Sequence, residues 1–269
     1  DYITFYFCET VPSMFVTTEN NTMEYINADK TVKESATFAT YNCDGSLDTI
    51  GYCNFSGRGY SSWSRSQKSY NLNLSDATSI LGMNSVARWA LLANYSSEFP
   101  QIKNKIAFEL AEKLDLPYTT QSEFVQVYLN GHYNGLYLLT QRIDVDGSVK
   151  INNLDEANEL LNSEEDYHGH FQTVSNGLYR AGALLANTPE TISGGYLMEF
   201  NARYKKETSY FSMPHQRVSI KSPRVATFKQ VDYISDYVGK AEEVLYNPDN
   251  TSESYLDYLD IDTWSKVYI

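Results

Sequence analysis

Residues 57–74 gather side chains that could hold a phosphate group. The stretch GRGYSSWSRSQKSYNLNL contains two glycines, several serines and the cations Arg58, Arg65 and Lys68, and it contains no carboxylate. Backbone amides of a glycine-rich bend and fixed cations together can cradle an anion. The alternative is a strand edge that is kept basic to prevent pairing with another edge. The glycines and serines that precede the strand favour the anion cradle.

A second basic stretch lies in the C-terminal half of the chain. Residues 203–229 carry seven lysines and arginines, Lys221 among them, against the single carboxylate of Glu207. For this stretch the anion site and the protected strand edge are equally open explanations.

The whole chain has a formal net charge of −13, so the part outside the two basic stretches is more acidic still. Proteins that bind nucleic acid or anionic membranes need a basic surface, so neither partner is predicted. No apolar run approaches the roughly 20 residues that cross a bilayer, so no membrane span is predicted. The two basic stretches therefore indicate a local anion.

The cysteines carry little information. Cys8, Cys43 and Cys53 are an odd number and form no CxxC pair, so neither a zinc site nor a disulfide framework is predicted. Cys43 and Cys53 flank a turn-like stretch, where they either face each other across a hairpin or are two buried thiols. The histidines include one close pair, in a polar loop, and no metal site is predicted.

The N-terminal half must position the first basic stretch, and its patterns predict strands. Apolar residues alternate with polar ones in 69–74, and a continuous apolar run at 87–94 indicates a buried strand. A helix is predicted over 102–114, from Ile102, Ile106, Leu110 and Leu114 at four-residue spacing. These are the stretches with strand composition: 14–18, 36–42, 51–56, 69–74 and 87–94.

The clearest local signal is a hairpin around Asn130-Gly131, with alternating apolar residues on both sides. The polar stretch 150–190 is predicted to be helix plus loop. Strands are predicted at 194–201 and 217–222, an amphipathic helix at 226–246, and another helix from Asp262. Because this last helix reaches the end of the chain, we expect the domain to be incomplete at its C-terminus.

The first basic stretch resembles the signature "RGNSSW…KKSYRIKL" of the spore-coat protein H (CotH) family of atypical protein kinases. RWALLANYSSEFPQIKNKIAFELAEKL is similar to that family's "kWvLLaNysD…RNklAyeLa", and VYLNGHYNGLYLLTQRID to its "VylNGeYxGlYlLtErId". GGYLMEFN and SIKSPRVATFKQVDYISDYV resemble two further segments. The five motifs occur in the family's order over residues 10–269.

The resemblance implies an α+β fold: a divergent, two-lobed, protein-kinase-like domain over residues 1–269. Residues 1–145 would form a β-rich N-terminal lobe, and 146–269 an insertion and the start of a more helical C-terminal lobe. It further implies a secreted or cell- or spore-surface protein that binds ATP and Mg²⁺ or Mn²⁺ and phosphorylates serines of other proteins. Neighbouring domains of a larger secreted chain are further expected partners.

The resemblance also implies a nucleotide site. The bend would cover the nucleotide, Lys68 would reach a phosphate, and side chains from the next hairpin and the second basic stretch would complete the site. The expected nucleotide-binding residues are Arg58, Ser62, Trp63, Arg65, Lys68, Tyr137, Gln141 and Lys221. The family's catalytic and metal-binding aspartates are expected beyond residue 269.

Two departures from the family pattern leave a second function open. Gln141 stands where the family has a glutamate, and an amide neither balances a lysine's charge nor binds Mg²⁺ as a carboxylate does. Ser96-Ser97 and Lys103-Asn104 replace the "D…RN" pattern, which exchanges a planar guanidinium for a point charge. The alternative to a kinase is therefore a non-catalytic binding or assembly module of the same family. A third reading, a carbohydrate-binding β-module, explains the tyrosines but neither the ordered motifs nor the helices.

Overall fold

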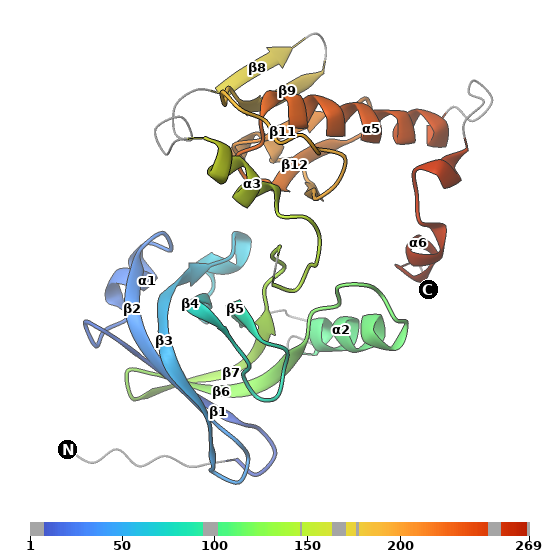
Figure 1. Ribbon diagram of the computed structural model, residues 1–269. Coiled ribbons are helices and arrows are strands. Elements are labelled where there is room, and N and C mark those ends of the chain that lie inside the picture. Colours follow the sequence, from blue (N-terminus) through green and yellow to red (C-terminus); the bar gives the residue numbers. More distant parts are fainter. Residues whose placement is uncertain are drawn as a thin grey trace. The chain divides into compact units, whose positions relative to one another are not determined.

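The computed structural model describes residues 8–93, 102–145, 147–162, 171–175, 178–246 and 254–267. The chain forms two compact units, Asp1–Val149 and Lys150–Ile269 (Figure 1). Each unit has its own buried apolar core.

The first unit is a closed seven-stranded barrel with the order β1-β2-β3-β4-β5-β7-β6. Neighbouring strands are antiparallel except β1 and β6, which pair in parallel from Ser13↔Gln126 to Val16↔Leu129 and close the barrel. The strands are β1 (Ser13–Thr18), β2 (Lys33–Tyr41), β3 (Leu47–Arg58), β4 (Ser69–Thr78), β5 (Val86–Leu92), β6 (Ser122–Leu129) and β7 (His132–Gln141).

Alternation along the strands fills the barrel. In β4, Tyr70 and Leu72 belong to the buried core, so Asn71 and Asn73 lie on the outer face of the barrel. Trp89 of the apolar run in β5 is completely buried in the same core. The strand predictions for this half of the chain are confirmed. The alternation also determines which polar side chains lie on the outer face of the barrel, where they could contact a ligand.

The predicted hairpin is confirmed at its turn. Asn130 and Gly131 have φ angles of 49° and 79°, as a type I′ turn between β6 and β7 requires. The Asn130 side chain also accepts a hydrogen bond from the backbone N–H of Thr18, at 2.8 Å. The turn therefore also binds the end of β1.

Short helices accompany the barrel: α1 (Glu24–Ala28), η1 (Ser61–Ser64) and α2 (Lys103–Lys113). The α2 helix is confirmed, but its apolar stripe does not enter a core, because Ile102, Ile106 and Leu110 are exposed. Instead, Lys105 turns toward β6, where its ammonium donates to the carbonyl of Ser122 at 2.5 Å. The barrel interior is already filled by its own strands, so α2 can only lie on the outer surface.

The second unit contains a five-stranded sheet with the order β10-β12-β11-β9-β8, on which α5 packs (Figure 1). A Cβ atom on Gly182 of β9 would lie 2.9 Å from the Cα of Phe228, so glycine permits the close approach of α5. The elements are α3 (Leu154–Leu161), β8 (Phe171–Ser175), β9 (Tyr179–Ala183), β10 (Leu197–Phe200), η2 (Tyr204–Lys206), β11 (Tyr210–Ser212), β12 (Arg217–Ser222), α5 (Phe228–Tyr246), η4 (Tyr255–Asp257) and α6 (Ile261–Val267).

The predictions for the second unit are confirmed for both late strands and for the helices α5 and α6. The prediction of helix plus loop for 150–190 is partly wrong. This stretch contains the predicted helix, α3, but it also contains a hairpin formed by β8 and β9. The strand β9 has the sequence YRAGA, with two alanines and a glycine and no β-branched residue. Its composition therefore gives only a weak strand signal.

The predicted α+β class is confirmed, and the closed barrel is the main difference from the expected fold. Composition and alternation predict strands, but the parallel pairing of β1 with β6 joins segments that lie more than 100 residues apart. Cys43 and Cys53 are free thiols, and β3 places Cys53 opposite Ala36, so the hairpin does not pair the two cysteines.

Candidate anion site

The glycine-rich bend between β3 and β4 is braced from within. The Lys68 ammonium donates to the carbonyl of Trp63 at 2.8 Å and lies 4.6 Å from the centre of the Trp63 ring. The Trp63 ring packs against Gly57, where a side chain would overlap it. Lys30 donates to the carbonyl of Gly59 at 2.8 Å. The bend's backbone carbonyls thus already engage two ammonium groups.

Two further predicted residues of the bend, Ser62 and Arg65, are exposed. Tyr137 and Gln141, the residues expected from the neighbouring strand, are buried. The Tyr137 hydroxyl donates to the carbonyl of Lys68 at 2.9 Å and accepts from Asn134, and burial raises its pKa. The tyrosine therefore fastens β7 to the start of β4.

Gln141 is only 4% exposed, and both ends of its amide are used. Its Nε2 donates to the carbonyl of Asn84 at 2.8 Å, and its Oε1 accepts from the backbone N–H of Gln121 at 3.2 Å. The side chain joins the β4–β5 loop to the start of β6. The amide thus has a structural role that a carboxylate would fill only in part.

Lys221 belongs to the second unit, where it pairs with Glu207 at 2.6 Å and with Glu199 at 3.5 Å. Burial lowers its pKa, but the two carboxylates outweigh burial, and the net pKa lies above the ordinary value. Glu199, in β10, is thus a strand residue that pairs with a nearby cation.

Three arginines form a basic cluster on the outer face of the barrel: Arg58, Arg88 and Arg142, which we call the arginine cluster. Arg58 ends β3, Arg88 lies in β5, and Arg142 directly follows β7. The ladder of β5 and β7 continues through the backbone bond from Arg142 N–H to the Arg88 carbonyl, at 2.9 Å. Strand pairing therefore brings together residues that are far apart in sequence.

The guanidinium groups of the cluster interact with one another and with polar neighbours. Burial lowers the pKa of Arg58, and the charge of Arg142 lowers it further. The pKa of Arg142 is likewise lowered by burial and then by Arg88, while Asp144 raises it. Asp144 binds the Arg88 guanidinium at 2.8 Å, and the three arginines and Asp144 together carry a formal charge of +2. Neighbouring cations that repel one another favour an additional anion.

The strand between Arg58 and Arg88 contributes two asparagines to the same outer face. Asn73 lies opposite Arg88 and accepts a hydrogen bond from Arg142 at 3.2 Å. Asn71, two residues earlier, has a buried side-chain oxygen without a hydrogen-bond partner. A buried acceptor without a partner is costly, so it favours a ligand that carries an N–H or O–H donor. The face thus offers cations for an anion and an acceptor beside them.

Sequence reasoning selected Arg58 but not Arg88, Arg142, Asn71 or Asn73. Arg88 and Arg142 have no local cluster of cations to mark them, and Asn71 and Asn73 are the polar positions of an alternating strand. The signal that could have found them is the register: on one face of a sheet, alternate residues of adjacent strands align.

The described part of the chain contains no group of three His, Cys, Asp or Glu side chains that could hold a metal ion. No helix among the described residues is long and apolar enough to span a membrane.

The comparison with known protein families gives a match. The model of the family described as CotH kinase protein matches residues 55–269, which include all three arginines of the cluster. No curated protein matches the chain.

Proposed function

Because the chain belongs to the CotH kinase protein family, we propose that it is a kinase module that binds the phosphates of ATP on the arginine cluster of its barrel. The observation that carries the proposal is the position of Arg142, which strand pairing sets beside Arg88 and whose charge also acts on Arg58 at the end of β3. Phosphoryl transfer depends mainly on positioning and on neutralising phosphate charge, and arginines supply both.

The residues of the cluster fit a nucleotide in two ways. Planar guanidinium groups bind phosphate oxygens in pairs of hydrogen bonds. The Asn71 oxygen, which lacks a partner, can accept a hydrogen bond from a hydroxyl or amine of the nucleoside. The bend with Ser62, Trp63, Arg65 and Lys68 would then border the site, and Tyr137 and Gln141 would support it from inside the barrel. Lys221 lies in the second unit, paired with Glu199 and Glu207, and we assign it no role at the barrel site.

A divalent ion, Mg²⁺ or Mn²⁺, would supply further charge neutralisation when bound with ATP. The described residues do not assemble a ligand set for it, so we assign it no ligands. We further propose serines of secreted or surface proteins as the acceptors. A non-catalytic module of the same family is the second candidate, because Gln141 holds the barrel together through its amide rather than offering a carboxylate.

The test is ATP binding, measured by titration calorimetry and by the shift of the melting temperature. Arg88→Gln and Arg142→Gln should each weaken ATP binding by about ten- to a hundredfold, since a hydrogen bond between charged groups contributes roughly 1.5–3 kcal/mol. Lys33→Gln, which removes a charge from an exposed position of β2, is the matched control and should bind ATP normally.

Two further variants separate the parts of the site. Lys68→Met should lower the melting temperature because Lys68 braces the bend, yet it should leave most of the ATP affinity. Asn71→Leu should weaken binding of ATP but not of inorganic tripolyphosphate. Unchanged ATP binding in both arginine variants would overturn the proposal, and loss in Lys68→Met alone would place the phosphates at the bend. Phosphate transfer from ATP to serine, measured on the same protein, separates a kinase from a binding module.

A further inference from the structure

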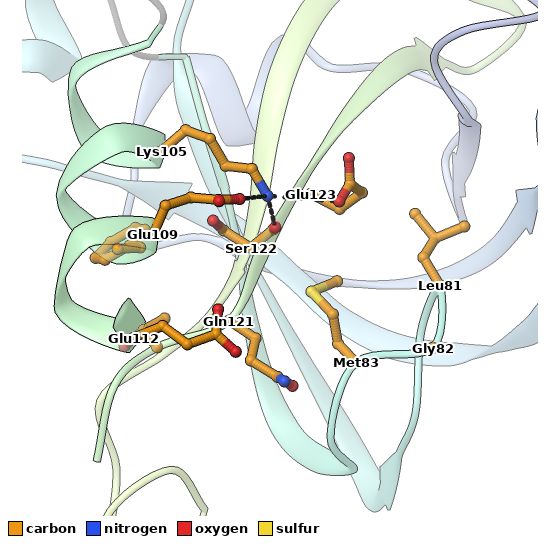
Figure 2. Close-up of a pocket in the computed structure, with 11 residues that line it drawn as sticks. Leu81, Gly82, Met83, Lys105, Glu109, Glu112, Gln121, Ser122 and Glu123 are labelled. Carbon is orange, nitrogen blue, oxygen red and sulfur yellow. Dashed lines mark hydrogen bonds and ion pairs between the residues drawn. The ribbon is translucent and has the colours of Figure 1, made fainter. Parts of the chain in front are cut away.

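A cavity of about 190 Å³ lies in the first unit between α2, the start of β6 and the β4–β5 loop (Figure 2). At about 30 Å³ for each water molecule, it has room for roughly six waters. Its lining includes Leu81, Met83, Lys105, Phe108, Glu109, Glu112, Ser122 and Glu123. We call it the acidic pocket.

The pocket carries an excess of negative charge. Glu109, Glu112 and Glu123 line the pocket together with one ammonium group, that of Lys105, which gives a formal charge of −2. Lys105 binds Glu109 at 3.0 Å and Glu123 at 3.5 Å. The Glu112 carboxylate makes no ion pair or hydrogen bond within the described part of the chain. One carboxylate therefore remains for a second cation.

A second, independent observation also indicates a ligand. Ser122 is only 8% exposed, and its hydroxyl oxygen is buried without a hydrogen-bond partner. Figure 2 shows Ser122 beside Lys105 and Glu109, on the side of its strand that faces α2. A buried hydroxyl without a partner costs free energy, which a bound donor would recover.

We propose that the acidic pocket binds a monovalent organic cation, an alkylguanidinium or alkylammonium group. Its nitrogens would donate to Glu112 and to the Ser122 hydroxyl, while Leu81, Met83 and Phe108 would cover its methylene groups. An arginine or lysine side chain of a peptide carries this group, and so does a free small amine. The site does not depend on nucleotide binding at the arginine cluster.

The experiment titrates the whole chain with butylguanidinium and with butylurea, its uncharged analogue of the same shape. Butylguanidinium should bind saturably and more weakly at high salt, and butylurea should not bind. A blocked Gly-Arg-Gly peptide is the second probe. If the peptide binds at least as tightly as butylguanidinium, the ligand is an arginine or lysine side chain of a protein. If butylguanidinium binds and the peptide does not, the ligand is a free small amine.

Three variants test the residues. Glu112→Gln should weaken butylguanidinium binding about threefold, as expected for an exposed charge pair, and Ser122→Ala about fivefold. The Ser122 hydroxyl makes no hydrogen bond within the described part of the chain, so Ser122→Ala should not lower the melting temperature, which excludes loss of fold as the cause. Glu24→Gln, at an exposed position of α1, is the matched control and should bind normally. Equal binding of butylurea, absence of butylguanidinium binding, or normal binding in both pocket variants would overturn the proposal.

Discussion

At the scale of single residues, Gln141 shows how an amide can be fixed by its two ends. Nε2 donates to the carbonyl of Asn84, and Oε1 accepts from the N–H of Gln121. Gln141→Glu keeps the acceptor but sets a carboxylate oxygen against the Asn84 carbonyl. We expect the free energy of unfolding to fall by about 1–3 kcal/mol at neutral pH, because a buried acceptor loses its donor. Denaturant unfolding measures this change.

The loss in Gln141→Glu should shrink at low pH, because a protonated carboxyl can again donate to Asn84. The same exchange at Gln216, which is exposed in the turn before β12, should change stability by less than about 0.5 kcal/mol. A Gln141→Glu protein as stable as the original at neutral pH would contradict the structural role of the amide.

The candidate site was only partly predictable residue by residue. Arg58 and Lys68 belong to a basic stretch that can be recognised from the sequence. The sequence of the stretch does not show where each side chain points. Lys68 turns back to its own bend, whereas Arg58 lies near Arg142, which in turn lies beside Arg88. Arg88 and Arg142 meet only through strand register, which residue types do not reveal.

At the scale of elements, patterns with a local cause were the most predictable. The turn at Asn130-Gly131 needs positive φ angles, and the strand 69–74 alternates because one face fills the barrel. Barrel closure has no such local sign, because the strands that close the barrel, β1 and β6, lie more than 100 residues apart in the sequence. The amphipathic spacing likewise predicted the helix α2, but it did not predict which face of α2 packs against the barrel.

The orientation of α2 gives a prediction at this scale. Ile106 is 57% exposed, whereas Phe108 lines the acidic pocket against the barrel. Ile106→Ala should therefore change the free energy of unfolding by less than about 0.5 kcal/mol, helped by the high helix propensity of alanine. Phe108→Ala should cost about 1–2 kcal/mol, because it leaves a gap between α2 and β6.

The matched pair of alanine variants is measured by denaturant unfolding under one set of conditions. A larger loss of unfolding free energy for Ile106→Ala than for Phe108→Ala would contradict this orientation. The buried face of α2 would then be the one that carries Ile106, and not the one that carries Phe108.

At the scale of the whole molecule, the charge is distributed unevenly rather than simply being negative. The chain carries −13, yet the arginine cluster holds three guanidinium groups close enough to lower the pKa of Arg58 and Arg142. Lys221, by contrast, is neutralised by Glu199 and Glu207. Cations that are already paired with carboxylates have less need of an anion, which is why the arginine cluster, and not the second basic stretch, is the stronger candidate.

Protonated groups that are buried in the first unit, and half-buried Tyr196 in the second, predict a loss of stability at alkaline pH. Burial raises the pKa of Tyr70 to about 12 and that of Cys53 to about 12, and it also raises the pKa of Tyr137 and Tyr196. The unfolded chain releases these protons first, near pH 8.5 for cysteine and near pH 10 for tyrosine. Stability from these groups is therefore complete below those values and is lost as pH rises toward about 12.

For Tyr70, a rise of about two pKa units corresponds to roughly 2–3 kcal/mol, lost between about pH 10 and pH 12. Unfolding measured at a series of pH values should show this slope, and Tyr70→Phe should reduce it although the variant also loses the bond to Asn27. Lysines lose their charge in the same range and increase the repulsion within an acidic chain, but salt screens that repulsion and does not restore a buried phenolate. A slope that disappears at high salt would therefore assign the alkaline loss to net charge and not to the buried core.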